Sequence, residues 1–390
     1  MSRAADASLV VGACVVFLAL AAVSGRTSIN RGVGPEGPMY QALAVDHDLQ
    51  AAPGVKKLTP AFPLATAIVY TVTGNVAASF LIVNVIAFVV LVVAARWILD
   101  LASAPPGVKA AVVATLCVLG LPSRTGAFDP GQPYLLGVAL LSLAVAASES
   151  SSGAVTGVLQ IGATLASPVG IAAPLYGIWR HWRLRRASAT AVVYLPSLVI
   201  WIATQYWARG GAAGLLDLMR FSRVRADAAF WSESAFILYG LYFLITSLGG
   251  LTILLSSNPR GIRDAISERP ELLALVVPVI PFIVTGGLEV PRVMPFLLPF
   301  WFLLVAAWGR EHAARLMVPL ALAMVLTLLT QHPWSRLTDT NYFVDWFPYS
   351  VAARRVGVSD PRFDATWRVR MFVAAGGLAA SVAWRRSLTR

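Results

Sequence analysis

The first polar stretch of the chain holds the carboxylate that is best placed for chemistry. Glu36 follows the apolar run 8–24 and lies between two Gly-Pro pairs. These pairs predict turns, and the amphipathic segment 39–45 predicts a short helix with Glu36 at or near its N-terminus. A carboxylate there could accept a proton from an incoming hydroxyl, as a general base does. The alternative is a charge that only favours the helix dipole.

Other acids lie in polar stretches as well. Asp46 and Asp48 flank His47, and two carboxylates with an imidazole could hold a divalent metal that bridges phosphate oxygens. The alternative for this triplet is a solvated helix end. Asp129 directly precedes Pro130 and an apolar run. It either belongs to the site or caps a helix that has proline at its first position.

Several basic residues later in the chain could bind phosphate. Glu289 and Arg292 lie between two apolar runs, where charges usually face a partner or a cavity. They could pair with each other, or Arg292 could bind a lipid phosphate, which suits the planar guanidinium. Arg220, Arg223 and Arg225 form a cluster that could contact anionic head groups or a phosphate-bearing substrate.

The composition predicts a membrane protein rather than a soluble one. Of the 390 residues, 57% are hydrophobic and 13% are charged, against about a quarter charged in soluble domains. The net charge of +12 could indicate nucleic acid, but the charges lie between apolar runs, so we expect membrane topology and no nucleic acid. No Walker A loop, dinucleotide fingerprint or His-Glu-x-x-His zinc motif is present in the sequence.

The apolar runs predict an all-α polytopic protein with about twelve membrane-spanning helices. Most runs are bounded by Pro, Gly or charged residues, as helix ends are. The first is expected to be an uncleaved helix rather than the core of a signal peptide. The expected spans are 8–24, 78–98, 107–122, 131–147, 154–166, 168–181, 187–207, 234–256, 271–288, 294–309, 315–331 and 369–385.

The distribution of Lys and Arg predicts the orientation. Basic residues next to helix ends in short loops, such as those of 180–186 and 260–269, indicate the inner side. Both termini are then cytoplasmic, in the plasma membrane. The long polar stretches 25–60, 208–233 and 332–370 lie outside. Aromatic residues between 334 and 349 could form an interfacial belt or a stacking surface for sugars.

Two segments decide on which side Asp129 lies. If 61–74 spans the membrane and 154–181 is one helix, Asp129 faces inward. If 61–74 lies along the interface and 154–181 breaks at Ser167-Pro168, Asp129 faces outward with Glu36. Proline disfavours a continuous helix, so we predict the second arrangement.

Together these features resemble the GT-C class of membrane glycosyltransferases over roughly residues 8–310. Segment 36–40, Glu-Gly-Pro-Met-Tyr, resembles the acidic and aromatic element of that family's first outer loop. Lys57 with Pro60 resembles a basic element before a helix that lies along the membrane. Asp129-Pro130, the break at Ser167-Pro168 and the Pro/Arg-rich segment 291–299 complete the pattern. The family more often has Asp at the position of Glu36 and Arg at that of Lys57.

The resemblance implies transfer of a sugar from a polyprenyl-phosphate carrier to an acceptor hydroxyl on a glycan, lipid or protein. Glu36 would be the catalytic base, and Asp46, Asp48 and Asp129 would be supporting acids. Arg292, Lys57, Arg220 and Arg223 would bind the lipid phosphate. The whole chain is expected to be one membrane domain, with a core module at 8–230 and variable C-terminal helices at 231–390 that include the outer segment 332–368.

Two matters stay open at the level of sequence. No cofactor is firmly predicted, and a divalent metal at Asp46 and Asp48 is the candidate. The alternative function is a lipid or glycolipid transporter or flippase without transferase activity. A transporter would be expected to carry ionisable residues within its spans, where the sequence offers mainly the polar Asn84 and Gln160.

Overall fold

The computed structural model describes part of the chain, and every described element is helical. The described residues are 3–48, 58–119, 126–150, 153–185, 187–212, 248, 259–285, 293–331, 336, 372–373, 375–377, 379–380 and 382–383. The predicted span 234–256 and the segment 332–368 lie almost wholly outside them, and the predicted span 369–385 is described only in short pieces. Within the described ranges the prediction of an all-helical protein is confirmed.

The N-terminal elements follow the predicted runs closely, with bounds that shift by a few residues. They are α1 (Arg3–Ser24), η1 (Ile29–Gly32), α2 (Gly37–Ala44), α3 (Ala61–Thr73), α4 (Val76–Leu101), α5 (Pro106–Val118), α6 (Gly126–Phe128), α7 (Tyr134–Ser150), α8 (Ala154–Ala166), η4 (Pro168–Ile171), α9 (Ala172–Arg183) and α10 (Ala187–Ala208).

The C-terminal elements differ more from the prediction. They are α15 (Pro259–Glu268), η5 (Pro270–Leu272), α16 (Leu273–Val276), α17 (Val279–Thr285), η7 (Met294–Leu297) and α19 (Leu298–Gln331). The predicted span 271–288 is divided into short helices, with Pro270, Pro278 and Pro281 in or beside them. The predicted spans 294–309 and 315–331 fall in one helical element, α19, without an intervening loop.

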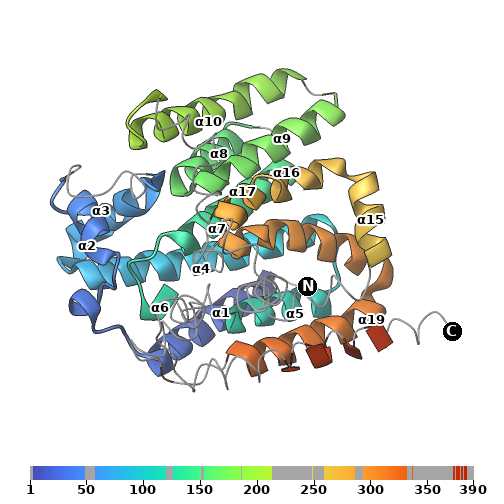
Figure 1. Ribbon diagram of the computed structural model, residues 1–390. Coiled ribbons are helices and arrows are strands. Elements are labelled where there is room, and N and C mark those ends of the chain that lie inside the picture. Colours follow the sequence, from blue (N-terminus) through green and yellow to red (C-terminus); the bar gives the residue numbers. More distant parts are fainter. Residues whose placement is uncertain are drawn as a thin grey trace.

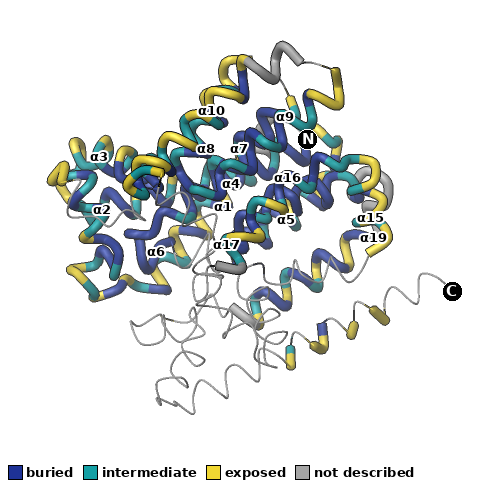
Figure 2. Tube along the Cα trace, turned by 45° about the horizontal axis from the view of Figure 1, so that its top comes forward, coloured by how far each residue is buried: buried dark blue, intermediate teal, exposed yellow. Residues whose placement is uncertain are grey.

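Helices α4 and α7 form the centre of the bundle (Figure 1). In Figure 2 most of α7 is dark blue, and α4 alternates between buried and partly exposed residues. Helices α1, α5 and α19 contact α4, and α8, α9 and α19 contact α7. Stacked Phe17 and Phe88, with ring centroids 4.7 Å apart, join α1 to α4. Phe62 of α3 stacks on Phe80 of α4 at 5.3 Å and meets the edge of Tyr40 from α2. These aromatic contacts attach the short helices to the central ones.

Local sequence explains where the helices begin and end. The side chain of Asn75 accepts a hydrogen bond from Ala78 N at 3.0 Å and so caps α4. Gly74, with φ +59°, ends α3 in the left-handed conformation. Ser167 and Pro168 break the run 154–181, and Trp201 Nε1 donates to the Pro168 carbonyl at 2.8 Å. The predicted division of 154–181 into two helices is therefore confirmed.

Two helical segments, Ala7–Ser24 in α1 and Val76–Leu101, are long and apolar enough to cross a membrane, and several shorter described helices are also apolar. Large apolar side chains at helical spacing point away from the bundle. They include Val11, Val15 and Leu18 on α1, Leu64, Ile68 and Val72 on α3, and Val192, Val199 and Ile202 on α10. Figure 2 shows the corresponding exposed stretches of α3 and α10 in yellow.

The elements gather at two opposite ends of the molecule. Helices α2, α3 and α6 lie at one end, and α15 lies at the other, in both views (Figures 1 and 2). We call these the α2 end and the α15 end. Arg336 approaches Gly25, the residue that follows α1, since a Cβ at Gly25 would lie 3.7 Å from Arg336 Nε.

The packing of α9 against α10 provides a test of the bundle. A Cβ at Gly177 would lie 2.1 Å from the ring of Tyr194, which is fully buried. We expect Gly177→Ala to destabilise the protein by about 1–3 kcal/mol, because neither helix can accept the added carbon without moving. Gly162→Ala is the matched control, since its Cβ would meet Leu140 at an ordinary 3.9 Å. Thermal unfolding of the purified protein should separate the two variants, and equal melting temperatures would contradict the packing.

Candidate functional site

Glu36 lies where the sequence predicts, at the N-terminus of a short helix. It is the residue immediately before α2, and its backbone carbonyl accepts from Met39 N at 3.1 Å. Its side chain is 9% exposed. Its position combines partial burial with the positive end of the α2 dipole, which favours a carboxylate. The helix-end interpretation and the catalytic one both remain compatible with this geometry.

Asp129 lies against the same loop. A Cβ added to Gly34, which has φ +81°, would lie 1.8 Å from Asp129 Oδ1. On the other side, a Cβ at Gly131 would lie 2.2 Å from the Val33 carbonyl oxygen and 2.9 Å from Gly37 Cα. The backbones on either side of Glu36 and Asp129 are therefore packed together, and two glycines make this approach possible. Glu36 and Asp129 therefore lie at the same end of the bundle, and the location of that end on the outer side of a membrane stays a prediction.

Asp129 does not cap a helix. It lies in a turn between α6 and α7, and α7 begins only at Tyr134. The capping interpretation, based on Pro130 as a first helical residue, is therefore wrong. Asp129 is fully buried, and Gln132 Nε2 donates to its Oδ2 at 2.8 Å. A buried carboxylate requires such donors, so Gln132 orients it.

The loop that carries Asp129 is fixed from α4. Asn84 Nδ2 donates to the carbonyl oxygens of Gly126 and Pro130, both at 2.9 Å, so one side chain holds the loop on each side of Asp129. Thr27 N donates to the Phe128 carbonyl at 3.0 Å and joins this loop to the stretch before α2. From the sequence, Asn84 was expected only to be a polar residue within a span.

The other predicted site residues are not all brought together by the described structure. Asp46, His47 and Asp48 are exposed at the end of α2, which agrees with a solvated helix end. Among the residues that the structure describes, no group of three or more His, Cys, Asp or Glu side chains could hold a metal ion. Lys57, Arg220, Arg223, Arg225, Glu289 and Arg292 lie outside the described residues. Phe296 of η7, a described residue of the same Pro-rich segment, packs on Gly137 of α7, where a Cβ would lie 3.0 Å from its ring.

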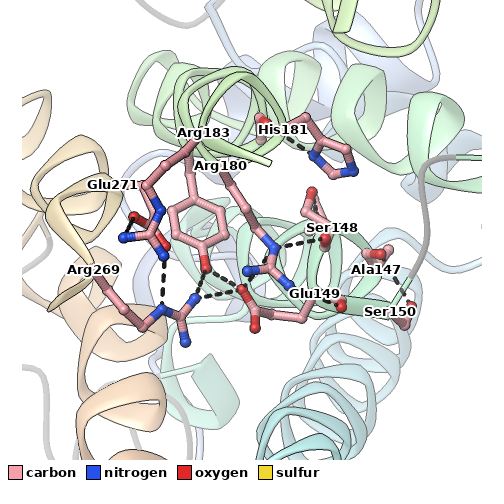
Figure 3. Close-up of polar contacts among 12 residues, drawn as sticks. Ala147, Ser148, Glu149, Ser150, Arg180, His181, Arg183, Arg269 and Glu271 are labelled. Carbon is pink, nitrogen blue, oxygen red and sulfur yellow. Dashed lines mark hydrogen bonds and ion pairs between the residues drawn. The ribbon is translucent and has the colours of Figure 1, made fainter. Parts of the chain in front are cut away.

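A second polar cluster lies at the α15 end, and the sequence did not predict it (Figure 3). Arg269 Nη2 lies 2.7 Å from Glu149 Oε1 and 2.6 Å from Tyr176 Oη, and its Nε lies 3.2 Å from Glu271 Oε1. Tyr176 also donates to Glu149, and Arg180 Nε lies 3.2 Å from the same carboxylate. Ion pairs thus join the C-terminal ends of α7 and α9 to the segment between α15 and α16.

Each carboxylate of this cluster lies within ion-pair distance of two arginines. Burial disfavours the Arg269 charge, but Tyr176, Glu149 and Glu271 outweigh that effect and raise the pKa of the guanidinium above its ordinary value. Arg183 adds a contact of 3.3 Å to the second oxygen of Glu271, which is fully buried. The sequence carries a signal only for Glu271, which follows Arg269 after one proline, because no Lys or Arg lies near Glu149 along the chain.

Behind this cluster, a chain of neutral polar groups crosses from α8 to α10. Gln160 Nε2 donates to Ser148 Oγ at 2.8 Å and to the Ala144 carbonyl at 3.2 Å. Tyr194 Oη lies 3.4 Å from Ser148 Oγ and 3.1 Å from Nδ1 of the buried His181. Gln160 is therefore used to join helices, as Asn84 is at the opposite end.

No family model, curated protein or solved structure matches this chain.

The close approach of the two acidic loops can be tested with a pair of glycines. Gly32 and Gly34 both have positive φ, at +88° and +81°, so alanine strains the backbone similarly at each. Only at Gly34 would the Cβ collide with Asp129; at Gly32 the nearest atom is 3.7 Å away. We expect Gly34→Ala to lower the free energy of unfolding by about 1–3 kcal/mol more than Gly32→Ala, measured by thermal unfolding. Equal losses would show that Asp129 does not rest on Gly34.

The charge cluster gives a separate prediction. Glu271→Gln leaves Arg269 and Arg183 without their buried carboxylate, so we expect a loss of about 3 kcal/mol. The control is Glu268→Gln, because the exposed Glu268 contributes its backbone carbonyl, which accepts from Arg183, rather than its carboxylate. This control should change stability by less than about 0.5 kcal/mol. A tolerated Glu271→Gln would contradict the cluster as a structural clamp.

Proposed function

We propose that the protein is a polytopic membrane glycosyltransferase that transfers a sugar from a polyprenyl-phosphate carrier to an acceptor hydroxyl. The observation that carries this proposal is the convergence of Glu36 and Asp129 on two interlocked loops at one end of a helical bundle. Two carboxylates held on a rigid backbone are suited to proton transfer at a bound hydroxyl. The resemblance of the sequence to the GT-C class supports the same activity.

The membrane placement rests on the apolar surface of the bundle. The exposed stripes on α1, α3 and α10 would be costly in water and favourable against lipid chains. Under the positive-inside rule, the basic residues near the ends of α9 and α15 support a cytoplasmic location for the α15 end. The α2 end, with Glu36 and Asp129, then faces outward, and α3 lies along the outer interface. About twelve crossings remain the prediction for the whole chain.

Transfer at this site would proceed by direct displacement. The acceptor hydroxyl gives its proton to the Glu36 carboxylate as its oxygen bonds to the anomeric carbon. The bond between that carbon and the phosphate oxygen breaks at the same time, and the lipid phosphate leaves with the electron pair. Asp129 is fully buried and held by Gln132, so it would position the loop that precedes Glu36 rather than touch the substrate. Arg292 is the candidate to stabilise the leaving phosphate.

The transporter alternative has less support in the described contacts. Asn84 and Gln160, the polar residues expected to mark a pathway, both donate to backbone carbonyls that join neighbouring segments. The buried carboxylates of Glu149 and Glu271 are paired with arginines at one end of the bundle. Transport of a glycolipid in proteoliposomes, without any sugar transfer, would favour the alternative.

The role of Glu36 is testable by substitution. Glu36→Gln keeps the size of the side chain and removes the base, so we expect sugar transfer from polyprenyl-phosphate donors to fall by about 10²–10⁴-fold. Asp129→Asn should also lower transfer, whereas Glu268→Gln, at the opposite end, should not. The assay uses purified full-length protein with radiolabelled donor sugars. Wild-type turnover in Glu36→Gln would show that Glu36 is not the base. Loss of sugar transfer in Asp46→Asn or Asp48→Asn, with normal transfer in Glu36→Gln, would assign that role to the acid at the C-terminal end of α2.

A further inference from the structure

The end of α9 presents an unusual run of side chains. Trp182, Arg183, Leu184 and Arg185 are consecutive and all exposed, with Trp182 at 72%. A tryptophan and a leucine next to two arginines are costly to leave in water. They match the interface of a bilayer, where aromatic rings lie at head-group level and arginines reach phosphate. We call these four residues the α9 patch.

Among the described residues, the acids near the patch do not cancel its positive charge. The sequence has no Asp or Glu between Glu149 and Asp217. In the adjacent cluster, the three guanidinium groups of Arg180, Arg183 and Arg269 face the two carboxylates of Glu149 and Glu271. Arg185 adds another positive charge. The nearby α15 exposes Asp264 and Glu268 together with Arg260 and Arg263, so it adds no net negative charge.

The patch is also held in place. Arg180 donates to the carbonyls of Ser148 and Glu149, both at 3.2 Å, and so fixes the last turn of α9 to the end of α7. Arg183 donates to the Glu268 carbonyl of α15. Figure 3 shows Arg180 and Arg183 directed into this cluster. A fixed surface loses little conformational entropy when it binds, which favours recognition over a flexible basic tail.

We infer that the α9 patch binds the anionic surface of a lipid bilayer through phosphate head groups. Arg185 and the remaining donors of Arg183 contact the phosphates, while Trp182 and Leu184 insert beside the acyl chains. The inference goes beyond sugar transfer and rests on the membrane placement within the proposed function. It holds whether or not the protein is a transferase. An acidic protein partner would use the arginines but would not account for the exposed Trp182 and Leu184.

The test compares two exposed arginines in the same backbone conformation. Arg185 has φ +57° at the α15 end, and Arg31 has φ +58° at the α2 end. Each is changed to Gln in the full-length protein, purified in an uncharged detergent. Binding of phosphatidylglycerol and of phosphatidylcholine is measured by native mass spectrometry. We expect Arg185→Gln to bind phosphatidylglycerol about fivefold more weakly than wild type. Arg31→Gln should bind it normally.

Further measurements separate the patch from general effects. Trp182→Ala should weaken binding of both lipids, because the ring contacts the interface whatever the head group. Melting temperatures in detergent alone should match wild type for Arg185→Gln, which shows that folding is intact. Wild-type phosphatidylglycerol binding by Arg185→Gln, or an equal loss in Arg31→Gln, would overturn the inference. So would Arg185-dependent binding of an acidic peptide without preference for phosphatidylglycerol.

Discussion

The two hydrogen bonds from Asn84 to the carbonyls of Gly126 and Pro130 are the contacts on which the candidate site depends. Backbone groups at the end of a packed bundle need partners, and a loop without them would be costly to bury. One amide on the central helix α4 provides both donors. The turn between them therefore holds Asp129 in a single position, and the loop before α2 is packed onto that turn. Close packing of the two backbones at Gly34, Gly37 and Gly131 positions both acids.

The two ends of the molecule are built on different physical principles. At the α2 end, glycines allow two backbones to approach within van der Waals contact, and few charges are involved. At the α15 end, long arginine side chains span the gaps between α7, α9 and α15 and pair with two carboxylates. Close packing fixes geometry with little tolerance, which suits a site for chemistry. A network of long side chains joins elements that are farther apart, which suits the connection between early and late parts of the chain.

Much of the described fold follows from patterns in the sequence. Apolar runs predicted the helices, and Ser167-Pro168 predicted the break within 154–181. The turns around Glu36 predicted α2. The sequence could not show that Asp129 lies in a turn rather than at the start of a helix, because a contact between two distant loops leaves no local pattern in the sequence. The sequence also predicted two spans where the structure has the single helix α19, because Arg310 and Arg315 resemble the charged residues of a loop. The charge cluster escaped prediction because its members are spread from residue 149 to 271, and the arginines were interpreted only as markers of orientation.

The separation of those members along the chain has a consequence for how the protein is made. Arg269 lies 120 residues after Glu149, its partner in the cluster. During synthesis from the N-terminus, Glu149 can pair with Arg180 long before Arg269 exists. The Glu149 carboxylate is then paired before the later helices have been made, which stabilises the first half of the chain during synthesis. Arg269 and Glu271 can complete the cluster only after the later part of the chain has been made.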